Sequence, residues 1–411
     1  MAKPKIFFIP TYIGPLKHYE RLIPYLKEKY DVGFLIVWPD GHRRQEAIEY
    51  CKEKKYECHV IDRGIGRDRR LRLPFITPIQ KRREHILACR NFLETVKPAK
   101  IISHKAWSPY ETIFKEANSK GVETIVLQWS SDAGLLPRDG YRHTLAKRLY
   151  LFLLEALFRI FDVFYAEPRY RSTPAVPKKI GVLYEDKARE YREKGYDPRT
   201  VHTVGSIDIQ LAHELKQKID SDNFLKTALL KKYGLSQEKL RIVVILHRFY
   251  LDPIPYAMTI EEHRNHYDQM FRILRDVFPA EEADIMLKLH PTENAMTDIY
   301  EPYKKLGVQV LYGSAKTDEL VCLSDLYIGE PASSVNYMAV GCGVPALFVN
   351  FSKARFLNEK IRYFSIQHVV GDANEFQEML RAFRRGALEK QHDASALNFR
   401  SLDQTISLIT Q

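Results

Sequence analysis

The sequence is poor in the residue patterns that mark metalloproteins, dinucleotide enzymes and secreted proteins. Its five cysteines are scattered and none forms a CxxC pair, which argues against a zinc site or a disulfide framework and predicts a reducing, cytoplasmic compartment. The chain holds no histidine and carboxylate cluster at ligand spacing, so no metal site is predicted. The segment RGIGR at 63–67 lacks the full glycine fingerprint of a dinucleotide-binding loop, and no cofactor is expected.

Long uninterrupted apolar runs are also missing. The apolar stretch at 5–10 is too short for a secretory signal and predicts a buried first strand. Residues 145–166 are rich in apolar side chains, but central charges interrupt the run and exclude a transmembrane span. These charges lie on one stripe of a helix, which predicts either a helix buried against a sheet or a helix lying at a bilayer surface. The second interpretation places the protein peripherally at the inner face of the plasma membrane.

The chain does contain a repeated alternation of short apolar runs and amphipathic stretches. Its 411 residues, 45% of them hydrophobic and 28% charged, form an ordinary globular composition with room for two cores. Strands separated by helical stretches predict parallel βαβ units. The expected fold class is α/β, of GT-B type, with two doubly wound Rossmann-like domains facing across a cleft. The expected strands are 5–10, 32–38, 57–62, 100–104, 123–128, 241–247, 284–290, 308–313, 326–330 and 345–350.

The boundary between the two domains is expected near residue 202. Residues 1–202 form an N-terminal, acceptor-binding domain, and its last part, 167–202, is interpreted as a connector because it is rich in Pro, Arg, Lys and Tyr. Residues 203–386 form a nucleotide-sugar-binding domain. Residues 387–411 form a C-terminal helix that can pack back on the N-terminal domain.

Positive charge is concentrated in one stretch of the sequence. The chain has a formal charge of +11, and residues 63–90 hold nine basic and two acidic residues, a net of +7. Pro74 and Pro78 disfavour a long regular element there. The stretch is interpreted either as a mobile loop that meets an anionic surface, such as a membrane or a lipid-linked acceptor, or as a solvated loop. No nucleic-acid partner is expected.

The second half of the chain places polar residues directly after two predicted strands, in 284–294 and 323–350. A strand that leads hydroxyl residues to the start of a helix builds an anion site, because free backbone N–H groups and the helix dipole point at the ligand. Both loops leave their strands at the carboxyl edge of the sheet, where ligands bind in open α/β folds. A phosphate-binding site is therefore predicted, and its polar residues are Lys288, His290, Pro291, Ser333 and Ser334.

Over residues 203–352 these motifs resemble those of the GT-B superfamily of nucleotide-sugar enzymes. CDP-glycerol glycerophosphotransferases, polysialyltransferases and related capsule transferases have motifs similar to His290-Pro291, Ser324-Asp325 and Ser333-Ser334. The non-hydrolysing UDP-N-acetylglucosamine 2-epimerase has motifs similar to Val204-Gly205, His247-Arg248 and the same His-Pro pair.

One departure separates these two branches. The epimerase carries an acidic pair on its phosphate-facing helix, and Tyr337-Met338 stand at the matching positions here. The acids that hold the ribose hydroxyls are missing, which argues against an epimerase, and a serine pair suits a CMP- or CDP-linked donor. The resemblance implies a CMP/CDP- or UDP-linked sugar donor, a glycan or lipid-linked acceptor, and no catalytic metal. The expected donor-binding residues are Gly14, Gly205, His247, Arg248, Lys288, His290, Pro291, Glu330, Ser333, Ser334 and Asn336.

Sugar transfer develops negative charge on the leaving phosphate, and imidazole or hydroxyl donors stabilise that charge. His290 is the candidate for this role in the second domain. An inverting transfer also needs a general base near the acceptor hydroxyl. Three residues of the first domain follow predicted strands and are unranked candidates: His18, in a helix after a glycine turn, His104 and Asp132. The alternative for each histidine is a structural loop residue whose hydrogen bonds are satisfied by neighbours.

Three functions fit these patterns. The first is a membrane-associated GT-B glycosyltransferase of surface-polysaccharide or capsule assembly, which releases free nucleotide only when an acceptor is present. The second is an NDP-sugar 2-epimerase, which interconverts two nucleotide sugars without an acceptor. The third is a non-catalytic GT-B-like binding protein, which binds nucleotide without turnover.

Overall fold

The computed structural model describes residues 3–10, 13–37, 41–61, 76–104, 110–128, 177–193, 195–246, 260–289, 297–330, 333, 335–351, 369–388 and 397–411. These residues form two compact units. Unit 1 comprises the described residues up to 205 together with 400–411, and unit 2 comprises those within 206–399.

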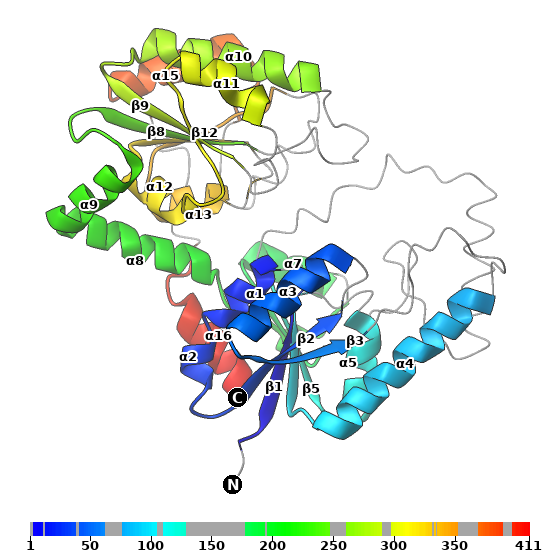
Figure 1. Cartoon of the computed structure of the whole chain (residues 1–411). Helices are drawn as coiled ribbons and strands as arrows, with labels where there is room; N and C mark the ends of the chain where they lie inside the picture. Colours follow the sequence, from blue (N-terminus) through cyan, green and yellow to red (C-terminus); the bar gives the residue numbers. More distant parts are fainter. Residues whose placement is uncertain are drawn as a thin grey trace. The chain divides into compact units, whose positions relative to one another are not determined.

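Unit 1 is built on a seven-stranded parallel sheet with the order β3-β2-β1-β4-β5-β6-β7 (Figure 1). Its strands are β1 (Lys5–Ile9), β2 (Asp31–Val37), β3 (Glu57–Ile61), β4 (Lys100–Ser103), β5 (Glu123–Leu127), β6 (Lys179–Val182) and β7 (Val201–Thr203). Its helices are α1 (Ile13–Glu20), α2 (Ile23–Leu26), α3 (Gly41–Glu53), α4 (Ile76–Val96), α5 (Tyr110–Ser119), α7 (Glu185–Glu193) and α16 (Ser401–Thr410).

Unit 2 is built on a five-stranded parallel sheet with the order β10-β9-β8-β11-β12. Its strands are β8 (Leu240–Ile245), β9 (Ala283–Lys288), β10 (Gln309–Leu311), β11 (Leu326–Gly329) and β12 (Ala346–Phe348). Its helices are α8 (Ile207–Ser221), α9 (Asn223–Tyr233), α10 (Ile260–Val277), α11 (Thr297–Lys305), α12 (Thr317–Leu323), α13 (Val335–Gly341) and α15 (Ala373–Arg384).

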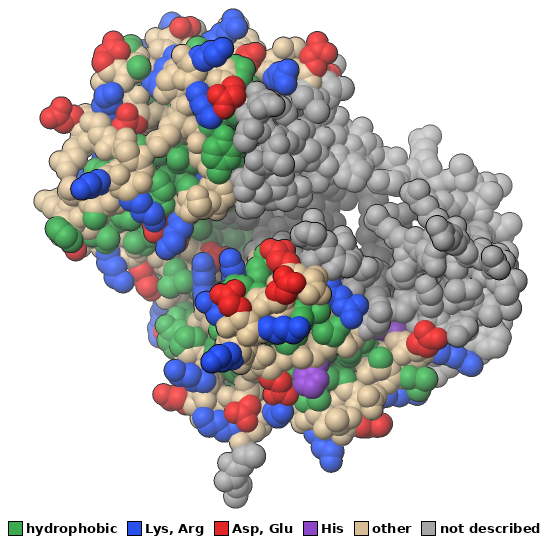
Figure 2. All heavy atoms as spheres, viewed as in Figure 1, with side chains coloured by type: hydrophobic (Ala, Val, Ile, Leu, Met, Phe, Trp, Pro, Cys, Tyr) green, Lys and Arg blue, Asp and Glu red, His purple; other side chains and the backbone are tan. Residues whose placement is uncertain are grey.

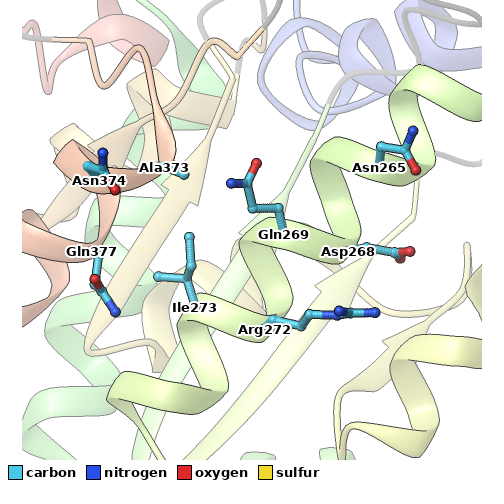
Figure 3. A pocket seen from close by; sticks show the side chains of 8 residues that line it. All are labelled: Asn265, Asp268, Gln269, Arg272, Ile273, Ala373, Asn374 and Gln377. Atoms are coloured by element: carbon cyan, nitrogen blue, oxygen red, sulfur yellow. The ribbon is translucent and has the colours of Figure 1, made fainter.

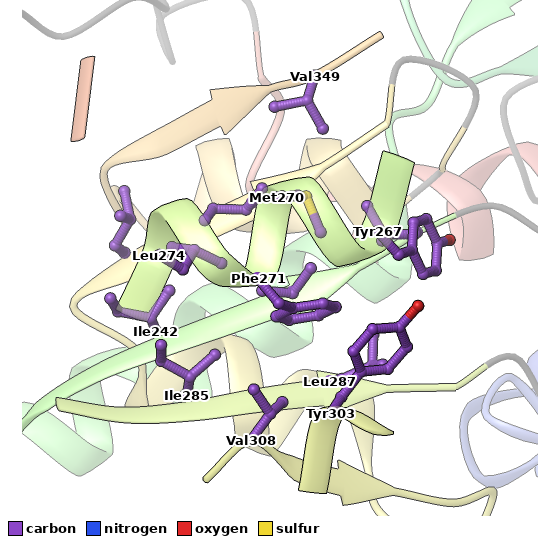
Figure 4. Packing of buried hydrophobic residues seen from close by; sticks show 14 of the residues in the cluster. Ile242, Tyr267, Met270, Phe271, Leu274, Ile285, Leu287, Tyr303, Val308 and Val349 are labelled. Atoms are coloured by element: carbon purple, nitrogen blue, oxygen red, sulfur yellow. The ribbon is translucent and has the colours of Figure 1, made fainter. Parts of the chain in front are cut away.

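An apolar core between helix α10 and the strands stabilises the sheet of unit 2. Helix α10 places Met270, Phe271 and Leu274 at helical spacing, in one cluster with the strand residues Ile242 and Leu287 (Figure 4). All five side chains are at most 1% exposed. Burying an apolar side chain of this size contributes about 1.5–3 kcal/mol. The strands whose carboxyl ends carry the candidate site are therefore held by a continuous apolar core.

In unit 2 an ion pair links the amino-terminal ends of β8 and β11, which lie at the opposite edge of the sheet from the candidate site. The Asp325 carboxylate, just before β11, accepts hydrogen bonds from Arg241 of β8: from Nε at 3.0 Å, from Nη2 at 2.8 Å and from the backbone N–H at 2.9 Å. The Ser324 hydroxyl donates to the Val321 carbonyl at 2.7 Å at the end of α12. The Ser324-Asp325 motif thus supports the sheet, at the edge away from the strands' carboxyl ends.

The interpretation of 167–202 as a connector is wrong for its described part. Residues 179–203 form β6, α7 and β7, which extend the sheet of unit 1 beyond β5. The strands contain only four and three residues, so they are too short to show an alternating pattern in a polar sequence. Their partners in the sheet, not their own composition, make them strands.

Helix α16 belongs to unit 1, where it lies against β6. The Lys179 ammonium donates to the Leu408 carbonyl at 3.4 Å. A Cβ atom at Gly181 would lie 2.8 Å from a Leu127 methyl and 2.9 Å from a Leu408 methyl. The glycine in β6 therefore leaves the space that the C-terminal helix fills.

Part of the basic stretch 63–90 is helical, which corrects the expectation that prolines prevent a long regular element. Helix α4 begins at Ile76 and has 21 residues. Pro78 lies in its first turn, where a missing N–H leaves no helical hydrogen bond unmade. Arg90 on this helix forms a two-point pair with Glu116 of α5, with Nε–Oε2 at 2.8 Å and Nη2–Oε1 at 3.1 Å. Its charge is therefore already paired within unit 1.

The charges of the described surface are mixed. On the face shown in Figure 2, basic and acidic side chains are interspersed over both units. Within the part of the chain that the structure describes, no helix is both long and apolar enough to cross a bilayer. The Arg-rich residues 63–75 and the apolar segment 145–166 are outside the described residues.

Candidate functional site

The strand order places a topological switch point in each sheet. In unit 2 the chain runs from β8 to β9 and β10 on one side, and then returns to β11 and β12 on the other. The carboxyl ends of β8 and β11 are neighbours, with Ile245 opposite Gly329. In unit 1 the ends of β1 and β4 are neighbours in the same way, with Ile9 opposite Ser103. Ligands of open α/β sheets bind outside the carboxyl ends of strands at such points.

In unit 2 a buried hydrogen-bond network fixes the loop that leaves β11 at this switch point. The Tyr327 phenol donates to the Asn336 side-chain oxygen at 2.7 Å, and the Asn336 amide donates to the Glu330 carbonyl at 2.7 Å. The Glu330 carbonyl also accepts the Ser333 N–H at 3.1 Å. Glu330 is 7% exposed and Asn336 only 1%. Asn336 therefore links Glu330 to helix α13, and donor contact at this residue stays a prediction.

Two members of this network were not expected from the sequence. Tyr327 is a fully buried strand residue, and burial raises the pKa of its phenol well above the ordinary value, so the hydroxyl stays a proton donor. Position 329 requires glycine because a Cβ atom there would collide with the network: it would lie 2.4 Å from both the Asn336 oxygen and the Tyr327 hydroxyl. The sequence LYIGE at 326–330 contained a signal for Tyr327 and Gly329. It has an aromatic residue with a polar tip inside a buried strand, followed by glycine at the strand end.

Ser333 takes part in local capping. Its hydroxyl accepts the Val335 N–H at 3.3 Å and is also hydrogen-bonded to the Tyr327 phenol. The serine therefore shapes the start of the seven-residue helix α13, as a helix-capping residue does. Its neighbour Ser334 is outside the described residues, so the expected phosphate role of the serine pair stays a prediction.

Lys288 ends β9, the strand next to β8. It is 4% exposed, and its ammonium donates to the Leu289 carbonyl at 2.8 Å. A buried ammonium at the carboxyl edge of the sheet is a group that a phosphate would stabilise. The other expected donor-site residues of this edge, His247, Arg248, His290 and Pro291, are not among the described residues.

In unit 1 the structure brings two candidate catalytic residues to the same region. His104 follows β4 directly, and His18 lies on α1, the helix after β1. Both are 7% exposed. The His18 ring lies 5.9 Å from the Tyr19 ring, and the His104 ring lies 5.9 Å from the Tyr110 ring. We refer to these four residues as the His–Tyr cluster. The third candidate, Asp132, is outside the described residues.

Burial keeps His18 and Tyr19 of the His–Tyr cluster uncharged. It lowers the pKa of His18 to about 3, with the charge of Arg21 as a second cause. Burial also raises the pKa of Tyr19 well above its ordinary value, and the nearby Tyr110 phenol adds to this. The Tyr19 ring stacks on Phe8 of β1 at 4.6 Å, and its buried hydroxyl has no hydrogen-bond partner among the described residues. His18 and Tyr19 therefore offer neutral hydrogen-bonding groups.

The two expected donor-site glycines have different local roles. Gly14, expected in a turn, lies in the first turn of α1. Gly205 has a φ of 77°, a conformation that favours glycine, and directly precedes Ser206, the N-cap residue of α8. Gly205 therefore sets the backbone turn where the chain passes from unit 1 to unit 2. Donor contact at Gly14 or Gly205 stays a prediction.

A groove of about 530 Å³ lies between helices α10 and α15 (Figure 3). Its lining is mostly polar: Asn265, Asp268, Gln269, Arg272, Ile273, Ala373, Asn374 and Gln377. These residues lie along two helices and not at the strand ends, so the groove is separate from the switch-point site. Among the described residues, no three His, Cys, Asp or Glu side chains are grouped as metal ligands would be.

No family model matches the sequence, and no curated protein matches it. Solved structures resemble it over the whole chain. UDP-GlcNAc 2-epimerase from Neisseria meningitidis, bound to UDP-GlcNAc, matches with a TM-score of 0.62 at 10% identity, over 98% of this chain and 99% of that one. The epimerase from Methanocaldococcus jannaschii matches with a TM-score of 0.60 at 10% identity, over 100% and 99%. MurG from Acinetobacter baumannii matches with a TM-score of 0.54 at 12% identity, over 99% of each chain.

At these identities the likeness shows the fold alone. The expected α/β class, with two Rossmann-like domains of GT-B type, is confirmed. The specific resemblance to CDP-glycerol glycerophosphotransferases and polysialyltransferases is not shown by these structures.

Proposed function

We propose that this protein is a nucleotide-sugar-dependent glycosyltransferase that binds its donor at the β8/β11 switch point of unit 2. The observation that carries the proposal is the buried Tyr327–Asn336–Glu330 network. A buried polar network costs stability unless every member is satisfied, and it rigidifies the backbone that it holds. Here it holds the loop at the sheet edge where ligands of such folds bind. A preorganised loop at that place is what a binding site requires.

The leaving group of the transfer is a nucleoside mono- or diphosphate. Its negative charge would meet the Lys288 ammonium, the Ser333-Ser334 hydroxyls and the His290 imidazole, all close in sequence to the ends of β9 and β11. Fixed donors of this kind lower the barrier because they need little reorganisation as charge develops. This chemistry requires no metal, in line with the GT-B transferases that the sequence resembles.

The acceptor is assigned to unit 1, at the β1/β4 switch point. His18 and Tyr19 supply a neutral imidazole and a neutral phenol there. A pKa near 3 makes the His18 imidazole a poor proton acceptor, so His18 suits hydrogen bonding to an acceptor hydroxyl. His104 and Asp132 remain the candidates for the general base. A glycan or lipid-linked acceptor of surface-polysaccharide assembly is the substrate class proposed.

A 2-epimerase is the second candidate, because epimerases are among the solved structures that share the fold. The residues of α13 weigh against it. Tyr337 stands where the epimerase motif has an acid, and it is 5% exposed. A buried tyrosine cannot replace a carboxylate that accepts two ribose hydroxyls.

Product analysis separates the two candidates. The full-length protein is incubated with each nucleotide sugar, with and without a mixture of membrane glycolipids and oligosaccharides, and the nucleotides are resolved by anion-exchange chromatography. We expect free nucleotide to appear only with an acceptor. A second nucleotide sugar formed without acceptor would instead identify an epimerase, and nucleotide binding without any product would identify a binding protein.

A further inference from the structure

Four of the five cysteines, which are scattered in the sequence, form two pairs in the folded chain. In unit 1 the thiols of Cys51 and Cys58 are near enough to influence each other, which raises the pKa of Cys51 and lowers that of Cys58. In unit 2 the Sγ atoms of Cys322 and Cys342 lie 3.7 Å apart although 20 residues separate them. The sequence spacing hid both pairs, because helices and strands, not a CxxC turn, bring the thiols together.

The pair in unit 2 has an inner and an outer thiol. Cys322, on α12, is 2% exposed, and Cys342, directly after α13, is 8% exposed. The Cys322 thiol donates to the Ala212 carbonyl of α8 at 3.2 Å, which holds it in place beside Cys342. The hydrogen bond with Cys342 and burial raise the pKa of the Cys322 thiol, so it is kept protonated. An oxidant from solution therefore meets Cys342 first, with a second thiol already in contact behind it.

We propose that Cys322 and Cys342 are a redox modification site that forms a reversible disulfide with a hydroperoxide as oxidant. The Cys342 thiolate attacks the peroxide, its S–O bond forms, the O–O bond breaks, and the other oxygen leaves as alcohol or water after taking a proton. The Cys322 sulfur then attacks the Cys342 sulfenic acid. The S–S bond forms, the S–O bond breaks, and hydroxide leaves as water with the Cys322 proton. A dithiol reverses the reaction and is itself oxidised to a disulfide.

The bond would join α12 to α13 and enclose β11 in the loop. The enclosed residues include Tyr327, Asn336 and Glu330, the three members of the network described above. Oxidation would therefore restrain the same segment that carries this network, whatever reaction the protein performs.

Peptide mapping of the full-length protein tests the proposal. The reduced protein is exposed to a small excess of hydrogen peroxide, denatured in N-ethylmaleimide and digested with trypsin. No lysine or arginine lies between Lys316 and Lys353, so both cysteines fall in peptide 317–353. We expect this peptide without maleimide and about 2 Da lighter than its reduced form, because two thiol hydrogens are lost. Dithiothreitol added before the maleimide should restore two labels. Cleavage on the amino-terminal side of Asp325, which lies between the two cysteines, should leave two pieces that stay linked until reduction.

The other thiols provide internal controls. Cys51 and Cys58 fall in separate tryptic peptides, 45–52 and 56–63, so a bond between them is read independently. The C51S/C58S variant should still oxidise peptide 317–353, and the C342S variant should leave Cys322 fully labelled. Two maleimides on peptide 317–353 at every peroxide concentration would overturn the proposal. So would bonding of Cys322 or Cys342 to another cysteine in place of each other.

Discussion

The phenol of Tyr327 donates a 2.7 Å hydrogen bond to the side-chain oxygen of Asn336 and so links strand β11 to helix α13 across the loop after the strand. The Asn336 amide continues the link to the Glu330 carbonyl. Because all three groups are buried, none can exchange its partner for water without rearrangement of the loop. The network therefore fixes Glu330 relative to helix α13 before any ligand arrives.

The first prediction concerns Asn336. The substitution Asn336→Ala leaves the buried Tyr327 hydroxyl without its acceptor, which costs about 1–3 kcal/mol, while the Glu330 carbonyl keeps the Ser333 N–H. We expect a lower midpoint of thermal unfolding and weaker binding of nucleotide, measured by calorimetric titration of the folded variant. Asn374→Ala is the matched control, since Asn374 is an exposed residue of the α10/α15 groove. Equal loss of nucleotide binding in both variants would contradict a donor site at the β8/β11 switch point and would indicate binding in that groove.

The second prediction concerns the groups that meet the leaving phosphate. Lys288→Met, His290→Ala and Ser334→Ala should each lower turnover by about ten- to a thousandfold, the range for lost transition-state donors. Steady-state kinetics with nucleotide sugar and acceptor measure this effect. Lys304→Met serves as control, because Lys304 forms an exposed pair with Glu301. Near-normal turnover in all three site variants, with the fold intact, would remove the phosphate from this edge of the sheet.

The third prediction concerns pH. The pKa of His18 is lowered to about 3 in the folded chain, so only the unfolded chain binds this proton between that pH and the ordinary value of 6.5. Stability should therefore fall as pH drops below 6.5, by up to about 1.4 kcal/mol per pH unit from this group. His18→Phe removes that contribution.

Urea unfolding at pH 6.5, 5.5 and 4.5 measures the difference. We expect the stability of the wild type to decrease more steeply with acidity than that of the variant. Parallel curves for the two proteins would show that the His18 proton is bound in the folded state as well.

The fourth prediction concerns the arginines at the start of the basic stretch. Each Arg or Lys near an anionic leaflet contributes about 1 kcal/mol, and salt weakens the effect. Replacing Arg67, Arg69, Arg70 and Arg72 with Gln should weaken co-sedimentation with anionic vesicles and leave nucleotide binding unchanged. Arg90→Gln should have little effect, since Arg90 is paired with Glu116. If the wild type does not bind vesicles at low salt, the stretch is a solvated segment.

The sequence predicted the strands well because most are continuous apolar runs bounded by polar turns. The run 284–290 corresponds to β9, and the run 326–330 corresponds to β11. The pattern failed at β6 and β7, which are short strands in a sequence rich in polar residues, because pairing in the sheet and not composition makes those strands. Pro78 led to the wrong prediction that no long helix forms there. A proline ends a helix only when it lies beyond the first turn.

The roles of the polar residues were harder to predict. Ser324-Asp325 and Ser333-Ser334 look alike in sequence, yet Asp325 binds Arg241 at the amino-terminal edge of the sheet, while Ser333 lies beyond the carboxyl end of β11. The side-chain partner decides the role, and it is distant in sequence. The pairing of Cys322 with Cys342 was hidden for the same reason.

Nucleotide binding tests the central claim most directly. The midpoint of thermal unfolding is measured for the wild type and for Asn336→Ala with CMP, CDP, UDP, GDP and dTDP, each at millimolar concentration. A ligand that binds only the folded state raises the midpoint by mass action. We expect at least one nucleotide to raise the midpoint of the wild type, and the variant to show a smaller rise. No rise with any of the five, in a wild-type protein that unfolds cooperatively, would contradict a nucleotide-sugar function.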